Sequence, residues 1–391
     1  MRRLSALILL ILLTSAAHSQ GWESYKKLCD TSILSEYLGY EKSFTVIVPK
    51  EFRYGQRSTY PLIIVYDRQN ELNFNYTIQT MDYLTAFGQM PACVIIGVSS
   101  DNTKRYPETQ LKTSAANGLG EKNDRFIFKE LIPLARDFYA CNSFKLLIGH
   151  SRYGFFSTYQ LYKHFDELNG VISISPFFTQ KNVNLVDSIA NALSAYPTMP
   201  HQVYYQFATG DSIEDTRDYS LMRDRLNKAR KPDYFHFKGY EFYRSSHFTT
   251  PGLTVGQSLY TLFSEWANQS MRFYHDTTSA TSDYTKYAGA MNTVRLTYKE
   301  RIPFSIGVFN GKGWQFYNEG KYEQAIDAWK LLAEVYPDYS ESYLFIAMAQ
   351  KELKFPFENA LQYFLLNLEK SPFYSAAEKE ELKKEGLQLR E

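Results

Sequence analysis

The most informative segment of this sequence is FKLLIGHSRYGFFSTYQLY, residues 144–162. It contains a short apolar run, then a Gly-His-Ser turn, and then aromatic side chains at helical spacing. A strand that turns sharply into a helix around a serine is typical of a nucleophile elbow. Ser151 would be held there in a strained backbone conformation, and the N-terminus of the next helix would offer N–H groups to a developing oxyanion.

The segment departs from the usual GxSxG pattern at one position. The pattern has a small residue two places after the serine, where the backbones of strand and helix nearly touch. Here Tyr153 occupies that position and Gly154 follows it. We therefore expect either that the start of the helix is re-routed or that the site is impaired.

The composition is that of a globular protein without a strongly charged surface. The chain has 391 residues, of which 44% are hydrophobic, so it is long enough for two domains with full cores. Its 43 Lys and Arg residues nearly balance its 42 Asp and Glu residues, and the net charge of +1 gives no support for a nucleic-acid partner. We see no pair of His, Cys or carboxylate residues at metal-ligand spacing, so we expect neither a metal nor another cofactor.

The N-terminus has the features of a secretory signal peptide. Two arginines precede an apolar run at residues 4–13, and the small residues Ala17 and Ser19 suit a signal peptidase. We therefore predict a signal peptide over residues 1–19 and an exported, periplasmic or secreted protein. The apolar run is too short to span a bilayer, so no membrane span is expected after cleavage.

The three cysteines cannot all pair in disulfides. Cys93 and Cys141 lie at the starts of two expected strands that flank a third, and two strand spacings are about 9.5 Å. That distance exceeds the reach of an unstrained disulfide. We expect free, mostly buried thiols at these positions and at Cys29.

Apolar segments alternate with helical patterns through residues 20–270. Besides the elbow strand, the expected strands are residues 43–49, 62–66, 93–98, 170–175, 203–208 and 234–237. Expected helices outside the elbow are residues 22–37, 79–88, 125–139 and 216–229. This alternation predicts an α/β domain with a mostly parallel sheet sandwiched by helices, in which ligands bind at the carboxyl ends of the strands. The polar loop at residues 99–123 is expected to lie over one end of the sheet, outside the core.

From residue 306 onward the pattern becomes that of a helical repeat. Gly313, Ala325 and Trp329 fall in the small and large positions of a 34-residue tetratricopeptide-like repeat, whose small residues let paired helices approach. A second repeat follows if one residue is inserted near Lys354. A plain helical bundle is the alternative interpretation.

The expected domain boundaries follow from these patterns. Residues 271–305 would form a helical linker, and residues 306–391 the tetratricopeptide-like domain, with residues 376–390 as its capping helix. Two repeats are fewer than usually stand alone, so we expect this domain to pack on the helices between residues 258 and 299.

A serine at an elbow needs a base, and the chain order for such a site is serine, acid, histidine. His247 lies in a loop after a strand and before a helix, whereas His236 lies inside a strand and His275 follows the last helix of the domain. We therefore predict that His247 is the base.

The acid belongs in the turn after the strand at residues 203–208. Asp211 and Glu214 are both within reach of that turn, and we do not separate these two alternatives, whereas Asp215 suits a helix N-cap. Either carboxylate would accept a hydrogen bond from the imidazole Nδ1–H and stabilise the imidazolium that forms when Ser151 loses its proton.

Two backbone N–H groups are expected to form the oxyanion hole. One belongs to Arg152, directly after the nucleophile, and the other to Gln69, in the turn after the strand at residues 62–66. Losing one such donor typically costs about 3 kcal/mol of transition-state stabilisation.

Four stretches of residues 43–263 together resemble one known family. YPLIIVYDRQ is similar to the family's strand followed by Asp-Gly, FIFKELIPLARDFY to the helix before its elbow, LLIGHS to its elbow, and HFTTPGLTVGQSLYTLF to its catalytic-histidine segment. The family is that of the putative esterases, the esterase D and enterochelin esterase-like branch of the α/β-hydrolases. The resemblance implies the α/β-hydrolase fold, Ser151 as nucleophile, His247 as base, and the amides of Gln69 and Arg152 as the oxyanion hole.

Three positions depart from the pattern of that family. Arg68 replaces the glycine after Asp67, Tyr153 replaces the glycine two residues after the serine, and Ser245 stands where relatives often have glutamate. The first two would narrow the acyl pocket.

These observations favour an exported serine carboxylic-ester hydrolase that acts through an acyl-enzyme. The resemblance implies a small ester, or one linked to a glycan or a siderophore, as the substrate. The alternative is an impaired α/β-hydrolase-fold protein that serves as a binding or scaffold protein, with a partner or a second copy held by its helical repeats. A peptidase is a third, weaker interpretation, because we find no sign of a peptide-specific pocket.

Overall fold

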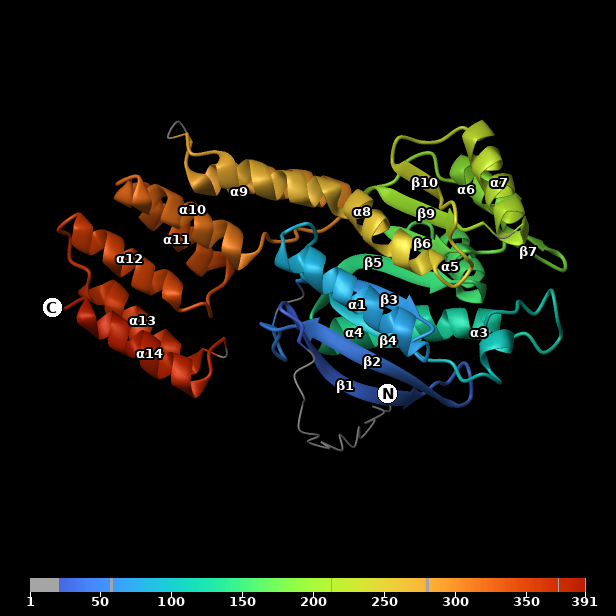
Figure 1. Cartoon of the computed structure of the whole chain (residues 1–391), viewed down its shortest axis with the longest axis horizontal. Helices are drawn as coiled ribbons and strands as arrows, with labels where there is room; N and C mark the ends of the chain where they lie inside the picture. The colour runs from blue at the N-terminus through green and yellow to red at the C-terminus, as the bar shows by residue number, and fades with distance from the viewer. Residues whose placement is uncertain (1–20, 57–58, 212, 279–280, 372, 391) are drawn as a thin grey trace, which may run out of the picture.

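The computed structural model describes residues 21–390 apart from residues 57–58, 212, 279–280 and 372 (Figure 1). Residues 213–215 are described by their backbone alone. The predicted signal peptide lies outside the described residues. None of the helices in the described part of the chain combines the length and apolar character that a bilayer span requires.

Within the described residues, eight strands form the central sheet, in the order β1-β2-β4-β3-β5-β6-β9-β10. Strands β1 and β2, and likewise β2 and β4, are antiparallel, and the other neighbours run parallel. The strands of this sheet are β1 (Tyr25–Leu34), β2 (Glu41–Pro49), β3 (Tyr60–Tyr66), β4 (Val94–Val98), β5 (Cys141–His150), β6 (Gly170–Ile174), β9 (Val203–Thr209) and β10 (Phe235–Glu241). The predicted mostly parallel sheet is confirmed. A two-stranded ribbon, β7 (Thr179–Gln180) with β8 (Val183–Asn184), lies outside it.

Helices cover both faces of the sheet. The helices of this part of the chain are α1 (Glu71–Ala86), α2 (Arg105–Glu108), α3 (Gly120–Arg125), the π-helical turn η1 (Phe126–Leu131), α4 (Ile132–Phe138), α5 (Arg152–Lys163), α6 (Leu185–Ala195), α7 (Ile213–Lys228) and α8 (Thr250–His275). Helices α1 and α8 share one hydrophobic cluster with Ile63, Ile95 and Leu146, while η1, α5 and α6 share another with Leu62 and Leu147. Neighbouring strand residues thus belong to opposite clusters, as the side-chain alternation of a strand requires.

The predicted helix at residues 22–37 is wrong, because this segment forms strand β1. Its side chains are mostly half-buried or exposed, which leaves little alternation for a sequence pattern to reveal. Strand β1 is an edge strand that pairs with β2 from Tyr25 opposite Pro49 to Leu34 opposite Glu41. Pairing with β2 therefore decides the structure of this segment against its local pattern.

The loop at residues 99–123 also differs from expectation. It contains α2 and the start of α3, and its Glu108 and Asn123 are fully buried. The loop therefore enters the interior beside the elbow, which its polar composition did not predict.

The cysteines lie as predicted. Cys93 precedes β4 and Cys141 begins β5, and these two strands flank β3. All three cysteines fall in the described part of the chain and are free thiols, two of them buried.

An all-helical region follows α8. Its helices are α9 (Asp283–Tyr298), α10 (Ile306–Asn318), α11 (Tyr322–Val335), α12 (Glu341–Glu352), α13 (Glu358–Lys370) and α14 (Ala376–Gln388). Helices α10 and α11 meet at Gly313, where an added Cβ would lie 2.2 Å from the indole Nε1 of Trp329. A glycine is therefore required for this helix pair to approach so closely. The tetratricopeptide-like character of the region remains a prediction.

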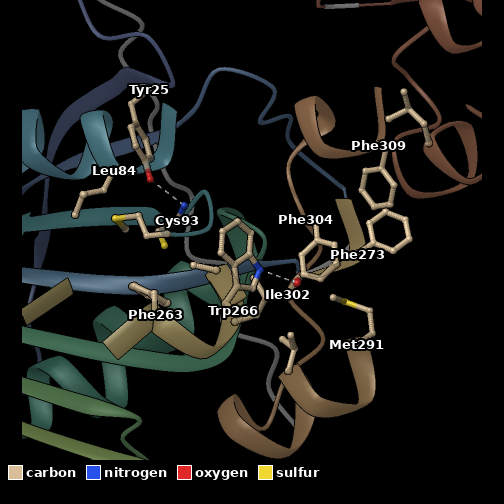
Figure 2. Close-up of a cluster of buried hydrophobic side chains, with 14 of the residues drawn as sticks. Tyr25, Leu84, Cys93, Phe263, Trp266, Phe273, Met291, Ile302, Phe304 and Phe309 are labelled. Carbon is tan, nitrogen blue, oxygen red and sulfur yellow. Dashed lines mark hydrogen bonds between the residues drawn. The ribbon is translucent and has the colours of Figure 1, made fainter. Parts of the chain in front are cut away.

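The sheet domain and the C-terminal helices share a continuous hydrophobic core (Figure 2). The first half of α8 packs on the sheet through Leu259 and Phe263, and its second half continues through Trp266 and Phe273 to Phe309 of α10. The indole Nε1 of Trp266 donates a 3.1 Å hydrogen bond to the carbonyl of Ile302. The C-terminal helices thus pack on α8 and complete a core that begins on the sheet.

Candidate functional site

The elbow is formed at the carboxyl end of β5. Ser151 lies between β5 and α5 with φ 59° and ψ −116°, a conformation that is strained for a residue with a side chain. Its backbone N–H donates a 2.8 Å hydrogen bond to the carbonyl of Ile174, which holds the turn against β6. The close backbone approach occurs at Gly149, where an added Cβ would lie 2.1 Å from the carbonyl oxygen of Tyr153.

Tyr153 points into the protein core. Its side chain is fully buried and its ring stacks on that of Tyr66, with the centroids 4.6 Å apart. Helix α5 begins at Arg152, directly after the serine, so the helix start is not re-routed. The ring that replaces the family's glycine is accommodated beneath the elbow.

A buried carboxylate accepts a hydrogen bond from the Tyr153 hydroxyl. Glu108 is fully buried and accepts hydrogen bonds from Tyr153 at 2.9 Å, Tyr40 at 2.6 Å, Lys42 at 2.5 Å and the Ser100 hydroxyl. Burial lowers the pKa of Lys42 and raises the pKa of Tyr153. A buried charge is tolerated when its hydrogen bonds are satisfied, and here the donors come from several elements. Glu108 therefore attaches the loop at residues 99–123 to the elbow.

Replacing Tyr153 by phenylalanine is expected to lower the free energy of unfolding by about 1–3 kcal/mol, because buried Glu108 loses one of its donors. Urea denaturation measures this change. Tyr162→Phe is the matched control, since Tyr162 lies on the same helix but is 40% exposed, and it should change the free energy by less than about 0.5 kcal/mol. Equal effects of the two substitutions would contradict a role for this network.

The turn after β3 is held by a second polar group. Asp67 has φ 60° and accepts two 2.7 Å hydrogen bonds from the guanidinium of Arg105. The side-chain amide of Gln69 donates to Asp67 at 2.8 Å and accepts from the backbone N–H of Ser100 at 2.9 Å. The loop at residues 99–123 therefore also positions the turn that carries the predicted oxyanion donor Gln69.

Arg68 extends away from this turn, toward β2. Its Nε donates to the hydroxyl of Thr45 at 2.8 Å and its Nη1 to Glu71 at 3.3 Å. A small cavity of about 30 Å³ lies beside the elbow and is lined in part by Asp67 and His150, but by neither Arg68 nor Tyr153. Neither side chain lines this small cavity, and the expected narrowing of the acyl pocket remains a prediction.

His247 lies in the loop between β10 and α8, beside the elbow. The Nε2 of His150 donates a 2.8 Å hydrogen bond to the backbone carbonyl of His247, and the two rings are 4.9 Å apart. A carbonyl only accepts, so Nε2 of His150 carries the proton, and burial lowers the pKa of His150 and favours its neutral form. The residue before the nucleophile thus ties the histidine loop to the elbow. The sequence interpretation missed this role of His150, although its place next to Ser151 was a signal.

The turn after β9 contacts the same histidine loop. The carboxylate of Asp211 accepts a hydrogen bond from the backbone N–H of Arg244, and the N–H of Asp211 donates to the carbonyl of Ser245 at 2.7 Å. Gly210 is required beside them, because an added Cβ would lie 2.2 Å from the Ser245 carbonyl oxygen. The side chain of Glu214 lies outside the described residues. The structure therefore brings the turn of Asp211 to the loop of His247 and does not separate the two candidate acids.

The other two histidines considered as bases lie elsewhere. His236 is exposed on β10, where its Nε2 pairs with the side-chain oxygen of Gln202. His275 is the last residue of α8. Of the three histidines considered as bases, His247 is the one whose loop contacts the elbow, through His150.

A much larger cavity lies at the other end of the sheet. It has a volume of about 1520 Å³ and opens between the sheet domain and the C-terminal helices, where Glu51, Tyr60, Arg301 and Tyr336 line it. Tyr60 begins β3, whereas the elbow lies where the parallel strands end. This cavity is therefore separate from the site around Ser151.

Comparison with known proteins gives one family match. A family model described as putative esterase matches residues 35–230, half of the chain. The matched residues include Ser151 and Gln69 but end before His247. No curated protein matches the sequence.

Several solved structures share the fold. An IroE-like serine hydrolase from Shewanella oneidensis superposes with a TM-score of 0.62 at 14% identity, over 79% of this chain and 100% of that one. An uncharacterised protein from Capnocytophaga ochracea gives 0.59 at 16% identity, over 92% and 99%. The BES protein from Bacillus cereus gives 0.51 at 16% identity, over 61% and 96%. The coverage in the second case means that the shared fold includes C-terminal helices as well as the sheet domain.

Proposed function

The chain belongs to the putative esterase family, and on this premise we propose that it is an exported serine hydrolase of carboxylic esters. The observation that carries the proposal is the backbone of Ser151, held at φ 59° between β5 and the N-terminus of α5. A serine in this strained position presents its hydroxyl above the sheet, next to N–H groups that have no partner within the helix.

In the proposed reaction, the Ser151 Oγ attacks the ester carbonyl carbon while His247 takes the hydroxyl proton. The carbonyl oxygen becomes an oxyanion, which the N–H groups of Arg152 and Gln69 stabilise. The C–O bond to the alcohol then breaks, the alcohol leaves with the proton from His247, and an acyl-enzyme remains. Water, deprotonated by His247, attacks the acyl carbon and releases the acid, which restores the Ser151 hydroxyl.

Asp211 or Glu214 is proposed to orient His247. The contacts of Asp211 with the histidine loop support its place in the site, and Glu214 follows it within one helical turn. In either case the carboxylate would accept the Nδ1–H of His247 and stabilise its imidazolium.

The proposed substrate is a small ester or one linked to a glycan or a siderophore. Family membership supports an ester, and a structural neighbour is named an IroE-like serine hydrolase. The rival interpretation of an inactive binding protein rested on Tyr153 and Arg68. Those side chains make their contacts in the core and on β2, so they give it no further support.

The C-terminal helices are proposed to be tetratricopeptide-like. The close approach of α10 and α11 at Gly313 supports this. A protein partner or a second copy of the chain would bind the faces of the C-terminal helices that do not pack against α8.

The test is labelling by a fluorophosphonate probe together with turnover of para-nitrophenyl acetate and butyrate. We expect the wild type to be labelled and to hydrolyse these esters, and Ser151→Ala to do neither, since the mutant lacks the nucleophile. Labelling and turnover by Ser151→Ala at the wild-type level would show that another residue is responsible. Absence of both in folded wild-type protein would favour the binding-protein alternative.

A further inference from the structure

Arg152 places a second chemical group beside the nucleophile, in addition to its backbone N–H. Its guanidinium lies 3.6 Å from the ring centroid of Tyr106 and 5.6 Å from that of Phe177. Tyr106 belongs to α2 and Phe177 follows β6, so the side chain is held between two segments at the carboxyl ends of the strands. The aromatic rings leave the planar guanidinium little freedom to move.

Among the described residues, the polar contacts of Arg152 are with uncharged groups. Its Nε donates to the hydroxyl of Thr109 at 2.8 Å, and its Nη2 donates to the side-chain oxygen of Gln110 at 3.2 Å and to the carbonyl of Tyr106 at 3.4 Å. Its neighbour Arg105 differs, because two hydrogen bonds pair it with the carboxylate of Asp67.

The described hydrogen-bond partners of this half-buried guanidinium are neutral. Burial opposes its charge and lowers the pKa of Arg152, and no carboxylate among the described residues offsets that cost with an ion pair. Its Nη1 donates no hydrogen bond to the described residues, although the other two nitrogens are oriented. The arrangement is thus a fixed cation with free N–H donors, one residue from Ser151.

We propose that the Arg152 side chain binds a carboxylate of the substrate, so that the enzyme prefers esters that carry a negative charge near the scissile bond. This inference rests on the proposed esterase function and narrows its substrate class. A guanidinium fork matches the geometry of a carboxylate, and the pair is strong where water is partly excluded. The charge of Arg105 is balanced by Asp67, whereas Arg152 has no carboxylate partner among the described residues.

The test compares each anionic ester with its neutral methyl ester. On the acyl side the pair is para-nitrophenyl hydrogen glutarate and para-nitrophenyl methyl glutarate, and on the alcohol side it is meta-acetoxybenzoate and methyl meta-acetoxybenzoate. The charge preference is the kcat/KM for the anionic ester divided by that for the neutral ester. This ratio cancels any change in chemistry common to both esters, including a disturbance of the oxyanion hole.

We expect Arg152→Gln to lower the charge preference about 10- to 100-fold for at least one pair, which also shows on which side the carboxylate binds. Arg152→Lys should retain part of it, because the charge remains without the fork. Arg136→Gln is the matched control, since Arg136 is an exposed arginine on α4 that pairs with Asp137. The charge preference of this variant should equal that of the wild type.

Salt provides a measurement that needs no variant. The wild-type preference should fall as ionic strength rises, because screening weakens the attraction of a partly exposed pair. Two results would overturn this inference but leave the proposed esterase function standing. One is a wild type that prefers the neutral esters, and the other is an Arg152→Gln enzyme that hydrolyses both members of each pair with unchanged preference. A folded wild type that hydrolyses none of the four esters would remove the proposed function, and the inference with it.

Discussion

His247→Gln is expected to lower kcat for para-nitrophenyl butyrate by a factor on the order of 10⁴ to 10⁶, the loss found when the base of a serine hydrolase is removed. Glutamine has a similar size but cannot take the proton of Ser151. The elbow should stay intact, because His150 donates to the backbone carbonyl of residue 247, which the substitution retains. The fluorophosphonate probe should accordingly label the variant far more slowly than the wild type.

His236→Gln is the matched control for this prediction. His236 is the second residue of β10, and it is exposed. Its substitution should leave kcat within about twofold of the wild type, while circular dichroism shows that both variants are folded. A loss of less than tenfold in folded His247→Gln would mean that another group is the base.

Removing residues 306–391 is expected to prevent the sheet domain from folding stably. The truncation takes away α10, which covers aromatic side chains of α8 and of the segment before α10. Phe304 and Phe273 are buried, and their ring centroids lie 6.4 Å and 5.6 Å from that of Phe309 (Figure 2). Exposing a large apolar side chain costs about 1.5–3 kcal/mol, and a domain has only about 5–15 kcal/mol of stability in total.

A buried cation adds to this effect. The Nζ of Lys312 is fully buried and donates 2.6 Å hydrogen bonds to the carbonyls of Phe273 and Asp276 at the end of α8. It also lies 3.4 Å from the carboxylate of Asp283. Without α10, these carbonyls and this carboxylate lose a charged partner at the point where α8 leaves the sheet domain.

The measurement is size-exclusion chromatography with thermal denaturation, on the truncated chain and on a control that lacks only residues 371–391. The control removes α14, of which only Gly386 is buried, so it should remain monodisperse with a modestly lower Tm. We expect the longer truncation to aggregate or to show no cooperative transition. A monodisperse, cooperatively folded product would instead indicate that the C-terminal helices serve a partner and are dispensable for the core.

Local pattern was sufficient for much of the central domain. Continuous apolar runs such as residues 62–66 and 170–174 are buried on both faces of the sheet, so their composition alone identifies them as strands. The elbow was recognisable because a strand, a Gly-His-Ser turn and a helical aromatic face follow one another within 19 residues, residues 144–162. The position of His247 followed from the order of the chain, since few histidines come after the candidate acids.

Long-range contacts decided the rest. Strand β1 is half-exposed, and its conformation depends on pairing with β2. The periodicity of residues 22–37 does not indicate this pairing. Tyr153 and Glu108 are 45 residues apart and both buried, and only their meeting shows that the departure from GxSxG is accommodated in the core. The neutral surroundings of Arg152 and the core that α8 shares with α10 also depend on contacts between residues that are far apart in the sequence. Sequence periodicity indicates which side of a helix or strand faces the interior. Which residues that side packs against depends on the packing of the whole chain.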